Sequence, residues 1–327
     1  MDAAVMIFFV LSGFVIAYVT DIKENNGYSY AVARASRVLS VALPALIATA
    51  IFDGIGNIIH KEYYNDSWGY QKDGIIFQYI GASIFINRIW YLDWGVGSNL
   101  PYWSLFYEVW YYIIFGVAAF SPSRWRLTAT LLLLALVGPN ILSLFPIWLL
   151  GFVAYRFYAA EQNAEKPRIG GFLGAILCFG AFGLAWHLKK NGIPSGLAEF
   201  FGSSKLTERY VIAFLFTAHI LGFSAISPWF RRISEIFARP VHWLAGATFT
   251  VYLFHLPITQ FLTTIMPWPP EATMTRLIMM PGVLALLFLV ASLTERRKAA
   301  WRRGIEAILS RHWAQPKAIR QMSRLNS

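Results

Sequence analysis

The sequence has a single cysteine and very little charge. Cys178 lies in an apolar run, and one thiol excludes both a disulfide framework and a thiol metal site. Charged residues make up 14% of the 327 positions, whereas a soluble domain carries about 25%. Because 57% of the residues are hydrophobic, the composition excludes an ordinary soluble domain and predicts an all-α, polytopic transmembrane helix bundle.

Acidic residues are also scarce. Asp and Glu number 17 against 28 Lys and Arg, which gives a formal net charge of +11. An excess of this size is also found in nucleic-acid-binding proteins, but here the basic residues lie in predicted loops and in the C-terminal tail. We therefore expect no nucleic-acid partner. We expect these basic residues to mark the cytoplasmic segments of the chain and to contact anionic membrane lipid.

An internal repeat is absent, so the sequence gives no support to an inverted-repeat transporter.

Nine apolar runs are long enough to predict membrane spans. They are 5–19, 38–52, 103–120, 125–137, 141–158, 170–186, 210–226, 243–262 and 277–293. A tenth run, 75–90, is interrupted by Gln78, Asn87 and Arg88. We expect this run to lie in the outer half of the membrane without crossing it.

The distribution of basic residues sets the predicted orientation. With nine crossings and a cytoplasmic C-terminus, 20 basic residues fall in inner segments and 8 in outer ones. If 75–90 also crossed, Arg34 and Arg37 would move outside and the contrast would weaken. We therefore predict an outer N-terminus. Because Met1 directly precedes a span without a basic segment before it, the sequence predicts a further helix upstream.

Two long outer segments and a basic tail complete the predicted organisation. The outer segments, 53–101 and 187–209, have the length of lids or binding surfaces. Residues 1–293 are predicted to form the transmembrane domain, and residues 294–327 a basic amphipathic cytoplasmic tail that lies on an anionic leaflet. The apolar face of the tail consists of Trp301, Ile305, Ile308, Leu309 and Trp313.

Glu108 is the most informative residue, because it lies inside the predicted span 103–120. A carboxylate within a membrane is costly, so it usually faces the protein interior and has a partner or a catalytic role. Ser104 lies four residues earlier, on the same helix face. The structural alternative is a glutamate that joins two helices through a hydrogen bond.

Three other groups of polar residues are candidates for a site. Arg34 and Arg37 can pair with phosphates bidentately, or they can anchor the inner end of a span. His255 lies inside a predicted span, where it is either a packing residue or a general base near neutral pH. Ser12, beside Gly13, allows close approach of two helices.

The depths of these residues can be compared. A rise of 1.5 Å per residue places Glu108, His255 and Ser12 roughly 9–10 Å below the outer ends of their spans. Arg34 and Arg37 lie at the opposite face. We expect a cavity in which a polar molecule is reached from outside and a phosphate-bearing molecule enters from inside.

Four short segments carry a family resemblance. They are Phe-Phe-Val-Leu-Ser-Gly-Phe at 8–14, Arg-Ala-Ser-Arg at 34–37, Trp-Ser-Leu-Phe-Tyr-Glu at 103–108 and Tyr-Leu-Phe-His-Leu-Pro at 252–257. In this order they resemble the acyltransferase-3 family of integral membrane acyltransferases, and the resemblance covers residues 5 to 293. The resemblance implies that the given sequence begins after the first helix of that family, which bears a basic residue and a histidine. With that helix, ten crossings would be expected.

The resemblance implies an enzyme that moves an acyl group, acetyl in particular, from cytoplasmic acyl-CoA to a hydroxyl of a sugar, polysaccharide or glycolipid. It implies a multi-pass protein of a bacterial inner membrane. The resemblance also implies that acyl-CoA is the donor substrate and that no metal or prosthetic group takes part. Arg34 and Arg37 correspond to the family residues that handle acyl-CoA, and Glu108 to its motif glutamate.

Without the histidine of the first helix, His255 is the best-placed general base for this reaction. Ser104 or Trp103 is predicted to hold the developing oxyanion, and Ser12 and Trp103 are predicted to line the substrate cavity. Two other functions remain open. A lipid or glycan transporter would move its substrate without consuming a thioester, and an inactive truncated homologue would bind without turnover. Release of free CoA in proteoliposomes distinguishes the enzyme from both.

Overall fold

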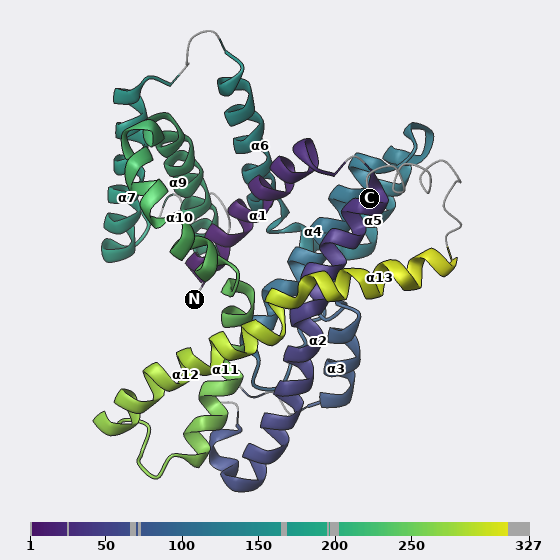
Figure 1. Cartoon of the computed structure of the whole chain (residues 1–327), viewed down its shortest axis with the longest axis vertical. Helices are drawn as coiled ribbons and strands as arrows, with labels where there is room; N and C mark the ends of the chain where they lie inside the picture. Colours follow the sequence, from purple (N-terminus) through teal and green to yellow (C-terminus); the bar gives the residue numbers. More distant parts are fainter. Residues whose placement is uncertain are drawn as a thin grey trace. The chain divides into compact units, whose positions relative to one another are not determined.

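The computed structural model describes residues 2–24, 26–65, 70, 73–164, 169–194, 196 and 203–312 (Figure 1). Within these residues the fold is all-helical, as the composition predicts. Several predictions concern residues outside this described part. They are the positions of Lys72, Lys166 and Arg168 in the charge count and the part of the tail that includes Trp313.

The chain divides into two compact units. Unit 1 comprises Met1–Asn25, Arg88–Tyr91 and Trp110–Val241, and unit 2 comprises Asn26–Asn87, Leu92–Val109 and His242–Ser327. Two helices, α4 (Trp103–Phe120) and α10 (Arg231–Ala245), contribute residues to both units.

Unit 1 is built from pairs of helices that approach closely. It contains α1 (Asp2–Ile22), α5 (Ser123–Leu142), α6 (Phe145–Gln162), α7 (Gly171–Asn191), α9 (Ser204–Ile226) and the short η4 (Ser227–Phe230). Helix α1 packs along α6, and α7 packs along α9 (Figure 1). A Cβ atom on Gly13 would overlap the carbonyl of Trp148, and one on Gly151 would overlap that of Val10. The predicted close approach at Ser12 and Gly13 is therefore confirmed.

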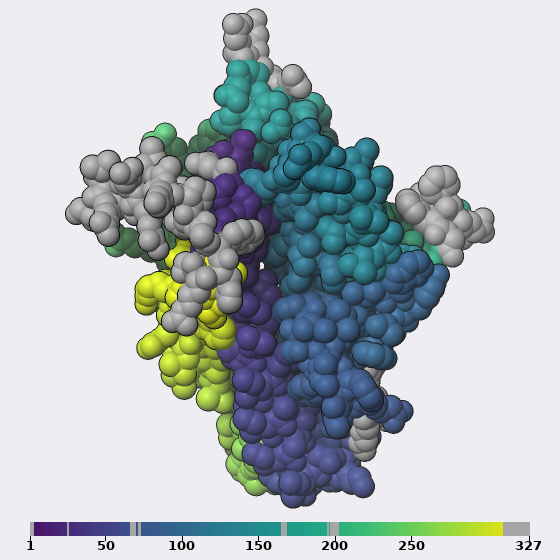
Figure 2. Space-filling model, turned by 90° about the vertical axis from the view of Figure 1, so that its right-hand side faces the viewer, coloured from purple at the N-terminus to yellow at the C-terminus, as the bar shows by residue number. Residues whose placement is uncertain are grey.

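Unit 2 is organised around α2 (Gly27–Ile59), which packs against α11 (Thr248–Ile265) and α13 (Lys298–His312). Figure 2 shows α2 in violet, with α13 in yellow on one side and the blue segment that contains α3 (Ile75–Ser83) on the other. The remaining elements are η1 (Lys61–Tyr63), η3 (Leu100–Tyr102), α12 (Thr273–Leu293) and η5 (Glu295–Arg297).

Seven helical segments of the described chain are long and apolar enough to cross a membrane. Helices α6 and α11 also match predicted spans but are not among the seven, because they carry more polar residues, such as Arg156 and His255. The chain is thus a multi-pass membrane protein, and the number of nine crossings stays a prediction. Helix α3 has nine residues, about 14 Å of rise, which is too short to cross a bilayer.

Two predicted boundaries are wrong. Helix α2 continues to Ile59, so Asp53 lies inside a helix and not in an outer loop. The helix extends past this charge because the carboxylate is buried and hydrogen-bonded to Ser98. The predicted span at 243–262 instead contains the end of α10 at Ala245 and the start of α11 at Thr248.

The close contact between α1 and α6 gives a testable prediction. We expect Gly151→Ala to lower the free energy of unfolding by about 1–3 kcal/mol, because the added methyl group meets backbone that cannot yield. Gly180→Ala in α7 is the matched control, since a Cβ there meets nothing within 4 Å, and it should be neutral or stabilising by up to about 1 kcal/mol. Thermal unfolding in detergent measures both. Equal effects of the two substitutions would contradict the packing described.

Candidate active site

The first turns of α4 carry three of the predicted site residues. Trp103 begins the helix directly after the 3-10 turn η3, in which Pro101 stands. Ser104 and Glu108, one turn apart, are both 2% exposed. The helix therefore directs these two polar side chains into the protein, as expected for a carboxylate in an apolar span. The ring of Trp103 lies edge-to-face with Tyr107 at 5.4 Å.

Tyr252 of α11 joins Ser104 to His255. The hydroxyls of Tyr252 and Ser104 lie 2.9 Å apart, and Nδ1 of His255 lies 2.8 Å from the Tyr252 carbonyl oxygen. A carbonyl oxygen only accepts hydrogen bonds, so Nδ1 is the nitrogen that carries the proton in the neutral ring. Nε2 then keeps its lone pair, which is the tautomer that a general base needs.

Asn99 fixes the position of this turn of α11. The residue is 1% exposed, and its side-chain nitrogen donates to the Thr49 hydroxyl of α2 and to the Leu253 carbonyl of α11, each at 3.0 Å. Leu253 directly follows Tyr252. The segment in front of α4 is therefore bound to both helices beside the residues of the candidate site.

Asp53 holds the neighbouring residue, Ser98. Its carboxylate accepts the backbone N–H of Ser98 at 2.9 Å and the Ser98 hydroxyl at 2.5 Å, and Asp53 is 3% exposed. Gly97 has φ +49°, and a Cβ atom on it would overlap the Asp53 carboxylate. Glycine is thus required both by the left-handed conformation and by the lack of space. Asp53 and Asn99 together set the conformation of the segment 97–99.

Two tyrosines beyond the end of α2 lie near enough to Asp53 to feel its charge. Tyr64 and Tyr70 lie edge-to-face at 5.4 Å, and the Tyr64 hydroxyl donates to the Phe52 carbonyl at 3.3 Å. Burial raises the pKa of both phenols above the usual value, and the charge of Asp53 raises each pKa further. Both tyrosines therefore stay neutral hydrogen-bond donors near neutral pH.

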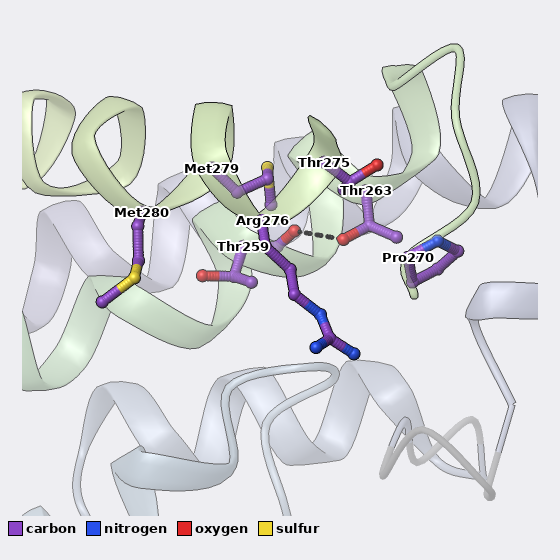
Figure 3. Close-up of a pocket in the computed structure, with 7 residues that line it drawn as sticks. All are labelled: Thr259, Thr263, Pro270, Thr275, Arg276, Met279 and Met280. Atoms are coloured by element: carbon purple, nitrogen blue, oxygen red, sulfur yellow. Dashed lines mark hydrogen bonds between the residues drawn. The ribbon is translucent and has the colours of Figure 1, made fainter. Parts of the chain in front are cut away.

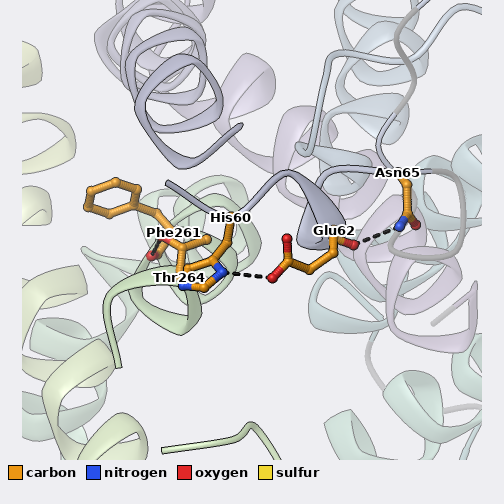
Figure 4. Close-up of polar contacts among 5 residues, drawn as sticks. All are labelled: His60, Glu62, Asn65, Phe261 and Thr264. Carbon is orange, nitrogen blue, oxygen red and sulfur yellow. Dashed lines mark hydrogen bonds and ion pairs between the residues drawn. The ribbon is translucent and has the colours of Figure 1, made fainter. Parts of the chain in front are cut away.

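An exposed polar cluster follows directly on α2 (Figure 4). Nδ1 of His60 lies 2.7 Å from the Glu62 carboxylate, and the Asn65 side chain donates to the Glu62 carbonyl at 2.6 Å. These groups are solvent-exposed, so water weakens the contact between His60 and Glu62 and its contribution is small. The cluster shapes the turn after α2 and does not resemble a catalytic centre.

A cavity of about 390 Å³ lies between α11 and the start of α12 (Figure 3). Its lining residues are Thr259, Thr263, Pro270, Thr275, Arg276, Met279 and Met280. Thr259 follows His255 by one turn, so the cavity continues the side of α11 that carries His255. Figure 3 shows the Arg276 side chain extending from α12. It is the one charged group among these residues, and the surface that they present to the cavity is mainly apolar.

Arg34 and Arg37 lie near the beginning of α2, where both are half-buried. Their spacing places both guanidinium groups on one face of the helix. The Arg34 guanidinium lies over the ring of Tyr30, 5.8 Å from its centroid. The pair therefore presents two neighbouring cations, which is the arrangement that suits phosphate groups.

Ser12 belongs to unit 1. It is 7% exposed, and its hydroxyl lies 3.2 Å from both the Tyr112 hydroxyl and Nε1 of Trp148, which donates to it. These contacts give Ser12 a role in joining α1, α4 and α6. Its predicted place in the substrate cavity stays a prediction.

The structure thus brings together Ser104 and His255 through Tyr252, and it adds two residues that the sequence did not single out. Asp53 carried a usable signal, since it is a carboxylate at the end of an apolar run. Asn99 carried none, because an asparagine close to glycine and proline residues is common in loops.

The long apolar helices identify the chain as an integral membrane protein, and the buried polar residues among them form its candidate site. A family model for an acyltransferase domain matches residues 2–296, which include every residue of the candidate site. The chain therefore belongs to the acyltransferase-3 family of membrane acyltransferases, and the resemblance of its four short segments is confirmed. Comparison with curated proteins and with solved structures finds no match.

The contact between α4 and α11 can be tested by a double-mutant cycle. Ser104→Ala and Tyr252→Phe should each lower the free energy of unfolding by about 0.5–1.5 kcal/mol, because each removes the same hydrogen bond. The double variant should lose less than the sum of the two. As a control, Tyr210→Phe, which removes a bond to Ser143, should add to Ser104→Ala. Additivity in both cycles would show that the two hydroxyls do not interact.

Proposed function

We propose that the chain transfers an acyl group, acetyl in particular, from cytoplasmic acyl-CoA to a hydroxyl of a sugar, polysaccharide or glycolipid. Membership of the acyltransferase family over residues 2–296 is the observation that carries the proposal. In this proposal the protein resides in a bacterial inner membrane with its C-terminus in the cytoplasm. Helix α13 and the tail that follows it then contact anionic lipid through their basic residues.

The proposed reaction begins with proton transfer to Nε2 of His255 from the acceptor hydroxyl, whose oxygen attacks the thioester carbonyl carbon. The C–S bond then breaks, and the sulfur leaves as the CoA thiolate, which receives the proton from the imidazolium. The products are an ester of the acceptor and free CoA. The tautomer fixed by the Tyr252 carbonyl supports His255 in this role.

Ser104 and Trp103 are the proposed donors to the oxyanion that forms during the attack. The Ser104 hydroxyl lies 2.9 Å from Tyr252 and 3.3 Å from the Pro101 carbonyl, so its single proton has alternative acceptors and can be redirected. Glu108, buried one turn later, is proposed to balance the charge of the imidazolium.

Arg34 and Arg37 are proposed to bind the phosphates of the acyl-CoA, with which guanidinium groups form charge-assisted hydrogen bonds.

The cavity beside Thr259 favours one of the three proposed classes of acceptor. Because its lining is mainly apolar with one cation at Arg276, it suits a lipid-bearing acceptor better than a free sugar. A glycolipid is therefore the preferred acceptor among the three.

The role of His255 is tested by measuring release of free CoA from acetyl-CoA in proteoliposomes supplied with glycolipid. We expect His255→Gln to lower this rate roughly 10²–10⁴-fold, the usual effect of losing a general base. His219→Gln is the matched control, because His219 is also a membrane histidine with Nδ1 near a carbonyl, that of Cys178, at 2.9 Å. Equal losses in the two variants, or none in His255→Gln, would exclude His255 as the base.

The donor site is tested by the salt dependence of acyl-CoA binding. Replacing both Arg34 and Arg37 by Gln should weaken the affinity, and the loss should be larger at low salt than at high salt, because screening already weakens the interaction at high salt. Replacing Lys189 and Lys190 at the end of α7 removes the same charge elsewhere and should leave the affinity unchanged. An unaltered affinity in the arginine variant would count against this assignment.

A further inference from the structure

Helix α10 (Arg231–Ala245) separates apolar from polar side chains more completely than the other described helices. With 3.6 residues per turn, its apolar side chains fall within roughly 160° of the circumference. These are Ile233, Ile236, Phe237, Pro240, Val241, Trp243 and Leu244. The opposite side carries Arg231, Arg232, Glu235, Arg239 and His242.

The apolar side of α10 is open in the structure. None of the helix's residues is buried, and its six large apolar side chains other than Pro240 are each more than half exposed. A contiguous apolar face of this kind marks a surface that contacts a membrane or another protein. The position of α10 in the chain and its charges indicate which of the two it contacts.

Both ends of α10 are connected to membrane helices. The four residues of η4 link it to α9, and two residues link it to α11. Its 15 residues rise about 22 Å, and the charged side excludes a crossing of the hydrocarbon. A helix held at the membrane on both sides, with one apolar face, is most stable in the plane of the interface.

The C-terminal end of α10 is anchored by Trp243. Its ring stacks on Phe288 of α12 at 4.7 Å, and the Arg296 guanidinium lies over it at 4.3 Å. Arg296 also donates to the Trp243 carbonyl at 3.1 Å. The last turn is therefore fixed to the end of α12, the predicted span after α11.

The charge of α10 selects the type of lipid. Its polar side bears three arginines against one carboxylate, and Glu235 already pairs with Arg231 at 3.0 Å. The remaining cations, Arg232 and Arg239, complement negatively charged headgroups. We propose that α10 is an in-plane helix whose apolar face enters the boundary between headgroups and acyl chains of an anionic leaflet.

The proposal is tested by site-specific fluorescence in proteoliposomes of phosphatidylcholine and phosphatidylglycerol. In a Cys178→Ala background, an environment-sensitive label is placed at Phe237→Cys on the apolar side and at Glu235→Cys on the polar side. We expect nitroxide lipids to quench the label at 237, because the apolar face enters the boundary between headgroups and acyl chains by roughly 5–10 Å. We expect aqueous iodide to quench the label at 235. Ile233→Cys provides a second apolar position if Phe237→Cys fails to fold.

Two results would overturn the membrane contact. Iodide that reaches 237 as readily as 235 would mean that the face is in water. A label at 237 that neither quencher reaches would mean that another protein, or a second copy of this chain, covers it.

The preference for anionic lipid is tested by changing the lipid composition. We expect iodide quenching at 237 to rise when phosphatidylglycerol is omitted, and we expect this rise to vanish in Arg232→Gln/Arg239→Gln. An unchanged response to lipid composition would contradict the preference for anionic lipid.

Discussion

Two hydrogen bonds from the side chain of Asn99 hold the candidate site together. They join the segment in front of α4 to the Thr49 hydroxyl of α2 and to the Leu253 carbonyl of α11. Asn99 is shielded from water, so breaking them would leave buried polar groups unpaired at about 1–3 kcal/mol each. The geometry of Ser104 relative to Tyr252 therefore depends on an amide that contributes no chemistry itself.

This arrangement explains how a membrane helix bundle can hold a histidine in one tautomer. The carbonyl of Tyr252 is the acceptor for His255, and its hydroxyl is the partner of Ser104, so one residue orients two. In surroundings of low dielectric such hydrogen bonds are stronger than in water, and they fix the tautomer of the imidazole. Asp53 supports the same segment from α2 through Ser98.

Much of the fold could be predicted from the sequence, because apolar runs identify membrane helices directly; the predicted span 103–120 coincides with α4. The close contact at Gly13 could be predicted too, since small residues favour it. Asp53 was assigned to a loop, because hydropathy does not reveal that Ser98 satisfies its charge. Helix α10 was missed for a related reason: its arginines resemble a loop until helical periodicity is considered. The bonds of Asn99 join residues far apart in sequence, which local patterns do not contain.

The central claim is that the reacting acyl group lies beside α4 and α11 within unit 2. Photocrosslinking with an acyl-CoA that carries a diazirine on its acyl chain, followed by peptide mapping, tests this claim most directly. We expect crosslinks in residues 103–108 and 252–259 that excess unlabelled acyl-CoA abolishes. Competed crosslinks confined to α7 and α9, with none in these two segments, would contradict it.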